Sequence, residues 1–210
     1  IRIWPAALLL ASLFSTGAQA ATFIVNDASD NPDMTLGDGQ CYIIGGGCTL
    51  RAAIEEANAS PGPHIIQFDF SGTPVTISPG TSLPALAQRI TIDGYAGGTG
   101  TPNTLATGHD ALIRIRLDGA NISGAASGLT FQFGSAGSVV RGLAITRFSW
   151  YGLSLSSGAA NDITIAGNFI GTDGSGTGGD ETGALANAII GIEIANGAAG
   201  ATIGGPAAAD

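Results

Sequence analysis

The feature that most restricts the fold of this chain is a short motif that recurs about every 24 residues. In each copy an apolar residue ends a stretch of alternating apolar and polar residues and is followed by a turn. The residues directly after the apolar position are 69, 93, 118, 141, 166 and 204, so the spacings are 24, 25, 23, 25 and 38. A period in the twenties is typical of solenoids, whose repeats bury their apolar side only by stacking on one another. The long last spacing indicates an insertion at 171–183, after which YGLSLSSGAANDITIAG (151–167) is repeated as IGIEIANGAAGATIGG (190–205).

Short alternating strands fill the chain after Pro63 and predict an all-β fold. The content of 34 Gly and only 11% charged residues, against about 25% in ordinary domains, suits strands joined by tight turns. We predict a single-stranded right-handed parallel β-helix over 64–210, with coils of about 24 residues. Its expected inward ladder consists of Ile92, Leu117, Val140 and Ile165. A β-sandwich is the alternative, because its strands also recur every 8–12 residues, but a sandwich predicts no repeat near 24.

The first 20 residues are predicted to be a signal peptide. Arg2 supplies a positive start, 6–14 is an apolar stretch, and Ala18-Gln19-Ala20 is a small-x-small cleavage site. The apolar stretch is shorter than the about 20 residues that span a membrane. Export leads to an oxidising compartment, so we expect a local disulfide between Cys41 and Cys48, which are the two cysteines of the chain.

Residues 21–63 are predicted to form an N-terminal cap that contains a strand, the disulfide loop and a short helix. The strand is expected at 21–27 and the helix at 49–59, where Thr49 can cap the first turn. Leu50, Ile54 and Ala57 fall on one apolar face of this helix, and Pro61-Gly62 ends it. Such a helix would cover the first coil, whose edge strand otherwise stays open.

The segment CTLRAAIEEANA, with a second cysteine upstream, resembles the CSLREA-type N-terminal motif of exported bacterial β-helix proteins. ITIDGYAGG and VVRGLAITRFSWYGLSLSSGAANDITIAGNFIGTDGSGT resemble the coils that follow this motif, so the resemblance covers essentially all of 21–210. Ala52 stands where the motif often has Glu. The resemblance implies a pectate-lyase-like β-helix in large surface or extracellular proteins that are described as adhesin-like. The chain begins with Ile and stops within the repeat pattern, so we expect it to be the front part of a longer protein.

Three aspartates and an arginine follow the apolar position of successive repeats, namely Asp69, Asp93, Asp118 and Arg141. If they stack, neighbouring carboxylates lie about 5 Å apart, which suits a catalytic pair or a Ca²⁺ site formed by Asp69, Asp93 and Asp118. The simpler interpretation is that each Asp caps a turn by accepting a hydrogen bond from its own backbone. In an enzyme, Asp93, Asp118 and Arg141 would be the catalytic candidates. We expect no resident cofactor, with Ca²⁺ as the one ion to consider.

Candidate binding residues lie in two places. Trp150 and Tyr151 could stack on sugar rings if they are exposed, although aromatic side chains at a strand end are more often buried. Asp173 and Asp180 belong to the Gly-rich insertion, which we expect to lie on the face that meets a partner. An EF-hand interpretation of this insertion fails, because Ala184 stands where the loop needs Glu.

The function expected from the sequence is an exported surface or extracellular module that binds a glycan, a protein or a surface. The formal charge of −9 without any Lys argues against nucleic acid as a partner. A membrane would be involved only through export or through an anchor in a missing C-terminal part. The alternative is a polysaccharide-active lyase or glycoside hydrolase of the pectate-lyase-like fold. No Ser-His-Asp, Walker A or dinucleotide motif occurs, so we expect a binding protein more than an enzyme.

Overall fold

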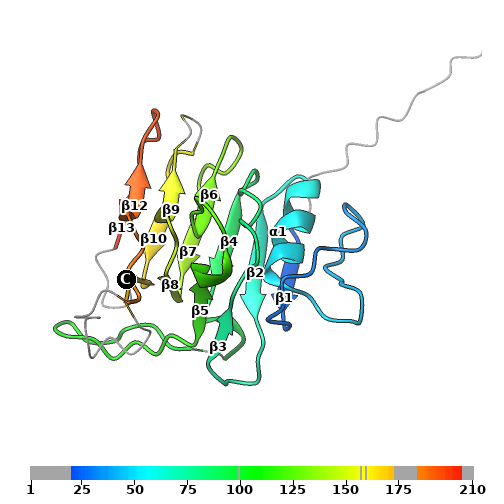
Figure 1. Ribbon diagram of the computed structural model, residues 1–210, viewed down its shortest axis with the longest axis horizontal. Coiled ribbons are helices and arrows are strands. Elements are labelled where there is room, and N and C mark those ends of the chain that lie inside the picture. The colour runs from blue at the N-terminus through cyan, green and yellow to red at the C-terminus, as the bar shows by residue number, and fades with distance from the viewer. Residues whose placement is uncertain (1–19, 99, 157, 159, 173–183, 205–210) are drawn as a thin grey trace, which may run out of the picture.

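Three parallel β-sheets and one α-helix make up the computed structural model, which describes residues 20–98, 100–156, 158, 160–172 and 184–204 (Figure 1). The six-stranded sheet contains β1 (Thr22–Val25), β2 (His64–Phe68), β4 (Ile90–Asp93), β7 (Val139–Arg141), β10 (Thr164–Ala166) and β13 (Thr202–Ile203). The four-stranded sheet contains β3 (Val75–Ile77), β5 (Ile115–Asp118), β8 (Leu143–Thr146) and β11 (Phe169–Ile170). The three-stranded sheet contains β6 (Leu129–Phe131), β9 (Tyr151–Leu155) and β12 (Ile190–Ile194). Two short 3₁₀ turns, Ala96–Gly98 and Gly119–Asn121, follow β4 and β5.

The chain visits the three sheets in the same order several times. It runs from β4 to β5 to β6, then from β7 to β8 to β9, and then from β10 to β11 to β12. Each of these passes adds one parallel strand to each sheet, in register with a strand of the pass before it. The mostly β character and the parallel stacking predicted from the sequence are therefore confirmed.

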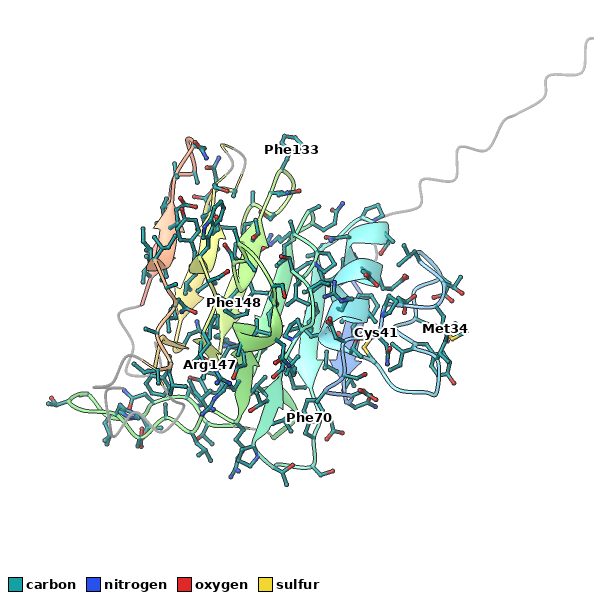
Figure 2. The ribbon with its side chains drawn as sticks, in the orientation of Figure 1. Met34, Cys41, Phe70, Phe133, Arg147 and Phe148 are labelled. Carbon is teal, nitrogen blue, oxygen red and sulfur yellow. A yellow bond between two sulfur atoms is a disulfide. The ribbon has the colours of Figure 1, made fainter. Side chains whose placement is uncertain are left out.

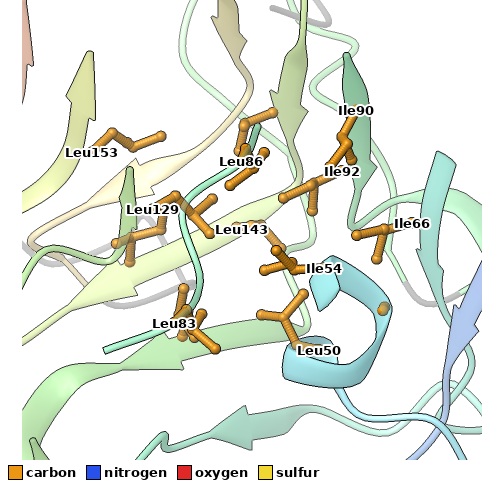
Figure 3. Close-up of a cluster of buried hydrophobic side chains, with 14 of the residues drawn as sticks. Leu50, Ile54, Ile66, Leu83, Leu86, Ile90, Ile92, Leu129, Leu143 and Leu153 are labelled. Carbon is orange, nitrogen blue, oxygen red and sulfur yellow. The ribbon is translucent and has the colours of Figure 1, made fainter. Parts of the chain in front are cut away.

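The interior consists of rows of apolar side chains that continue from strand to strand. In the six-stranded sheet Ile66, Ile92, Val140 and Ile165 are aligned and buried. Figure 3 shows Ile66 and Ile92 with side chains from the other sheets, such as Leu129 and Leu143, directed into the same cluster. Parallel strands lie about 4.8 Å apart, so side chains of one row pack directly against each other.

The predicted inward ladder is wrong at Leu117. This residue lies on the four-stranded sheet, between Ile77 and Ile145, and Val140 is the true neighbour of Ile92. The cause is the long segment 94–114 between β4 and β5, which makes the distance from Ile92 to Val140 48 residues. The spacing of 25 between Asp93 and Asp118 therefore separates two sheets within one pass, and the spacing of 25 between Val140 and Ile165 is a genuine repeat.

The N-terminal cap has the predicted parts. Helix α1 (Leu50–Ala59) begins at Thr49, whose Oγ1 accepts a hydrogen bond from the Ala52 N–H at 3.0 Å. Its buried face packs on the core cluster through Leu50, Ile54 and Ala57, as Figure 3 shows for Leu50 and Ile54. Cys41 and Cys48 form the predicted disulfide, and β1 pairs with β2.

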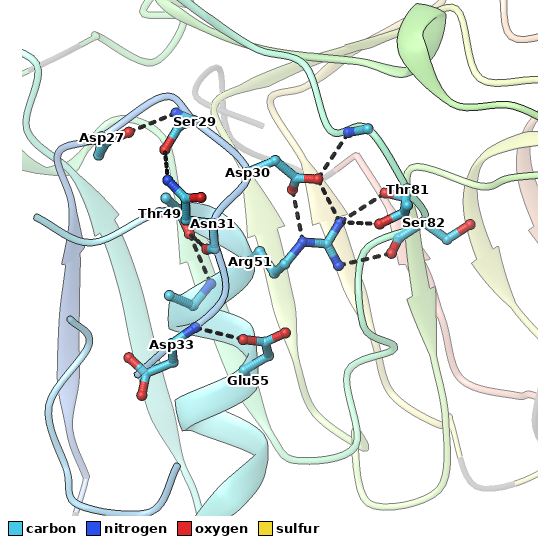
Figure 4. Close-up of polar contacts among 12 residues, drawn as sticks. Asp27, Ser29, Asp30, Asn31, Asp33, Thr49, Arg51, Glu55, Thr81 and Ser82 are labelled. Atoms are coloured by element: carbon cyan, nitrogen blue, oxygen red, sulfur yellow. Dashed lines mark hydrogen bonds and ion pairs between the residues drawn. The ribbon is translucent and has the colours of Figure 1, made fainter. Parts of the chain in front are cut away.

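Polar side chains tie this cap to the first pass of the chain (Figure 4). The Arg51 guanidinium binds both carboxylate oxygens of Asp30 at 2.9 Å and donates to the carbonyl oxygen of Ser82 at 3.1 Å. Glu55 accepts a hydrogen bond from the Asp33 N–H at 2.9 Å. These acidic residues of the cap therefore have structural partners inside the molecule.

Candidate functional site

A groove of about 370 Å³ lies over the three-stranded sheet. Its floor contains one polar row across three strands, because Thr130 of β6 is aligned with Ser154 of β9, and Ser154 with Glu193 of β12. This row alternates with the apolar residues of the same strands, such as the buried Leu153 and Leu155. More polar side chains complete the lining, namely those of Ser82, Ser127, Ser156 and Asn196. We call this feature the sheet groove.

An aromatic pair borders the sheet groove at the start of β9. The side chains of Trp150 and Tyr151 both line it, with ring centroids 5.6 Å apart and ring planes inclined by 35°. Trp150 is 46% exposed, although its backbone N–H is fixed by a hydrogen bond to the carbonyl oxygen of Ala126 at 3.0 Å. The structure therefore places the two aromatic residues singled out in the sequence together, on the surface.

Glu193 holds the hydroxyl groups of the sheet groove in place. Its Oε2 accepts a hydrogen bond from Ser154 Oγ at 2.8 Å. Its carboxylate also accepts a hydrogen bond from the Tyr151 hydroxyl, which, with burial and the negative charge of Glu193, raises the pKa of Tyr151. Tyr151 thus stays a protonated donor to Glu193 at neutral pH.

Neither Glu193 nor Ser154 was among the candidate residues of the sequence. The signal that locates them is the similarity between 151–167 and 190–205, which aligns Ser154 with Glu193. The strand register confirms this alignment, because Ser154 of β9 is paired with Glu193 of β12. The alternating pattern then directs both side chains to the outer side of the sheet.

Asp93 and Arg141 lie together as neighbours on β4 and β7, and they form an ion pair with 2.6 Å between Oδ2 and Nη2. The other oxygen of Asp93, Oδ1, accepts hydrogen bonds from the N–H groups of Tyr95 and Ala96. Asp93 is 5% exposed and therefore engaged on both sides. These contacts stabilise the corner between β4 and the segment that follows it.

Asp118 lies on a different sheet, where its strand neighbour is Thr146. Its carboxylate is fully buried, accepts from the Ala120 N–H at 3.0 Å and forms an ion pair with Arg147. The hydrogen bond to Asp118 raises the pKa of the Arg147 guanidinium, which stays charged at any ordinary pH. Figure 2 labels Arg147 beside Phe148 at the end of β8.

The predicted stack of Asp69, Asp93 and Asp118 is therefore wrong. Gln67, not Asp69, is the strand neighbour of Asp93, and Asp118 belongs to the four-stranded sheet. Each of the three carboxylates accepts a hydrogen bond from the N–H two residues later, so the turn-capping interpretation is confirmed.

No group of three or more His, Cys, Asp or Glu side chains within the described ranges is arranged to hold a metal ion. Asp173 and Asp180, the candidates of the insertion, lie outside the described residues. In that described part of the chain, no helix has the length and apolar character needed to cross a bilayer.

No protein-family model, no curated protein and no solved structure matches this chain.

Proposed function

We propose that this chain is an exported, non-catalytic glycan-binding module, that it is built as a right-handed parallel β-helix, and that the sheet groove is its binding site. The repeated order of the three parallel sheets supports the β-helix. Parallel strands joined by a crossover are right-handed in about 98% of cases, which supports the handedness. The signal-peptide pattern and the resemblance to CSLREA-type proteins support export to the extracellular space or the cell surface.

The exposed aromatic pair beside a polar row is the observation that carries this proposal. A sugar ring has apolar C–H faces and a rim of hydroxyl groups. Trp150 offers an exposed indole face to the first, and Ser154 and Glu193 offer oxygen atoms to the second. The groove volume lies within the range of about 300–1,000 Å³ that small-ligand sites have.

Binding is favoured over catalysis by the way the acidic residues are used. Glycoside hydrolases ordinarily employ two carboxylates on either side of the scissile bond. The described lining of the sheet groove contains one, Glu193. The candidates proposed for an enzyme, Asp93, Asp118 and Arg141, are engaged in ion pairs and turn caps that stabilise the fold.

The Trp150→Ala variant is expected to lose at least about tenfold in affinity for a polysaccharide that the wild type binds, because the stacking surface is removed. The measurement is affinity electrophoresis over a panel of soluble polysaccharides, followed by calorimetry with the best one. Phe133→Ala is the matched control, because Phe133 is 80% exposed on the turn after β6 and does not line the sheet groove (Figure 2). Full affinity in Trp150→Ala, or an equal loss in Phe133→Ala, would contradict the site.

The same polysaccharides, incubated with the wild-type protein, test the absence of catalysis. We expect neither new reducing ends nor unsaturated products. Turnover that disappears in Asp93→Ala would instead establish the enzyme alternative.

A further inference from the structure

We infer that the sheet groove selects uncharged glycans over anionic ones, and that Glu193 sets this selectivity. The inference rests on the proposed function and names the class of ligand for the same site. Glu193 is the one charged side chain among the described residues that line the groove. Any ligand that spans the row formed by Thr130, Ser154 and Glu193 therefore meets a fixed negative charge.

No described cation compensates this charge within the lining. Arg51 donates to the carbonyl oxygen of Ser82, which is a lining residue, but its guanidinium is paired with Asp30 at 2.9 Å. The Arg51 side chain is also 11% exposed, so little of it is accessible to a ligand. A carboxylate or sulfate ester of a glycan would thus approach Glu193 without a compensating partner, which is a strongly unfavourable arrangement.

The hydrogen bonds inside the groove favour the same class of ligand. Ser154 and Tyr151 both direct their hydroxyl hydrogens to Glu193. Their oxygen atoms, and the remaining lone pairs of the Glu193 carboxylate, are therefore available to a ligand as acceptors. Sugar hydroxyl groups can donate to these acceptors. Carboxylate and sulfate groups are acceptors only, so they cannot form these hydrogen bonds even where charge is screened.

The experiment compares pairs of polysaccharides that share a backbone and differ in charge. Suitable pairs are dextran with dextran sulfate, and hydroxyethyl cellulose with carboxymethyl cellulose. Wild type, Glu193→Gln and Asp38→Asn are compared by affinity electrophoresis at low ionic strength, and circular dichroism checks that each variant is folded. Asp38→Asn is the matched control, because it removes one negative charge from an exposed loop outside the groove.

We expect the wild type to bind the neutral member of a pair at least about tenfold more tightly than its anionic derivative. Glu193→Gln is expected to reduce this ratio by about tenfold, mainly by improving binding of the anionic member, whereas Asp38→Asn leaves the ratio within about twofold of wild type. An unchanged ratio in Glu193→Gln, or an equal reduction in Asp38→Asn, would overturn the role of Glu193.

Failure of the inference differs from failure of the proposed function. Anionic members that bind as tightly as neutral ones, but lose binding in Trp150→Ala, would leave the sheet groove as the site and overturn only the selectivity. Binding that does not depend on Trp150, or no binding to either member of any pair, would overturn the proposed function and the inference together.

Discussion

Replacement of Arg147 by Ala is expected to lower the free energy of unfolding by about 3–5 kcal/mol, far more than the loss of an exposed ion pair would. The guanidinium of Arg147 is the ion-pair partner of Asp118, whose carboxylate is fully buried. Without Arg147 this carboxylate would stay in the interior with one backbone hydrogen bond from Ala120 and no compensating charge. Urea denaturation followed by circular dichroism measures the change.

Two further variants separate the ion pair from other causes. Arg147 has a positive φ of 60°, which Ala tolerates poorly and Gly tolerates well. If the buried charge dominates, Arg147→Gly should be nearly as destabilising as Arg147→Ala. In an Asp118→Ala background, Arg147→Ala should then change the stability by less than about 1 kcal/mol, because no buried charge is left to compensate. A full effect in that background would contradict this explanation.

The Gly94→Ala variant is expected to lose at least about 3 kcal/mol of stability, because the added methyl group has no space. A Cβ atom at position 94 would lie 2.1 Å from the carbonyl oxygen of Gly142 and 2.6 Å from its carbonyl carbon, which are backbone atoms of the next pass. The two strands that flank this corner, β4 and β7, would have to separate. Thermal denaturation measures the effect.

Gly80→Ala is the control for this prediction. The nearest atom to a Cβ at position 80 is an Asp30 oxygen at 3.9 Å, an ordinary van der Waals distance, and its φ is not positive. This variant should keep nearly the wild-type stability. Similar stabilities of the two variants would show that the β4–β7 corner is not closely packed.

Local patterns in the sequence were enough to predict the elements but not the way in which the passes are counted. The cap helix and the disulfide depend on residues close together in the chain, such as Thr49 and the Cys41–Cys48 spacing, so they were predicted. The ladder failed because an Asp-Gly turn ends both β4 and β5. The two corners look alike in sequence although they lie in different sheets, and the segment 94–114 brought their spacing close to one repeat.

A repeated glycine carries the register of the three-stranded sheet more reliably. Gly128, Gly152 and Gly191 each precede an apolar-x-apolar strand, at spacings of 24 and 39 residues. A Cβ at Gly128 would lie 2.5 Å from the Gly152 carbonyl oxygen, and one at Gly152 would lie 2.6 Å from that of Gly191. These glycines are therefore close contacts between successive passes, and aligning them in the sequence pairs Thr130, Ser154 and Glu193.

Part of the sheet groove was predictable for the same reason. Trp150 and Tyr151 attract attention because they are adjacent aromatic residues, and the structure places them on the groove. Glu193 is separated from Ser154 by 39 residues, so its role follows only once the strand register is known. A single carboxylate in an alternating strand otherwise predicts nothing more than a solvated face.

The most direct test of glycan binding in the sheet groove is the fluorescence of Trp150. The chain has two tryptophans, Trp4 and Trp150, so the Trp4→Phe variant of the full chain reports on Trp150 alone. Titration with the neutral polysaccharide that binds best should shift the Trp150 emission to shorter wavelength, with the same saturation curve that calorimetry gives. Binding that calorimetry detects without any change in the Trp150 emission would contradict the sheet groove as the binding site.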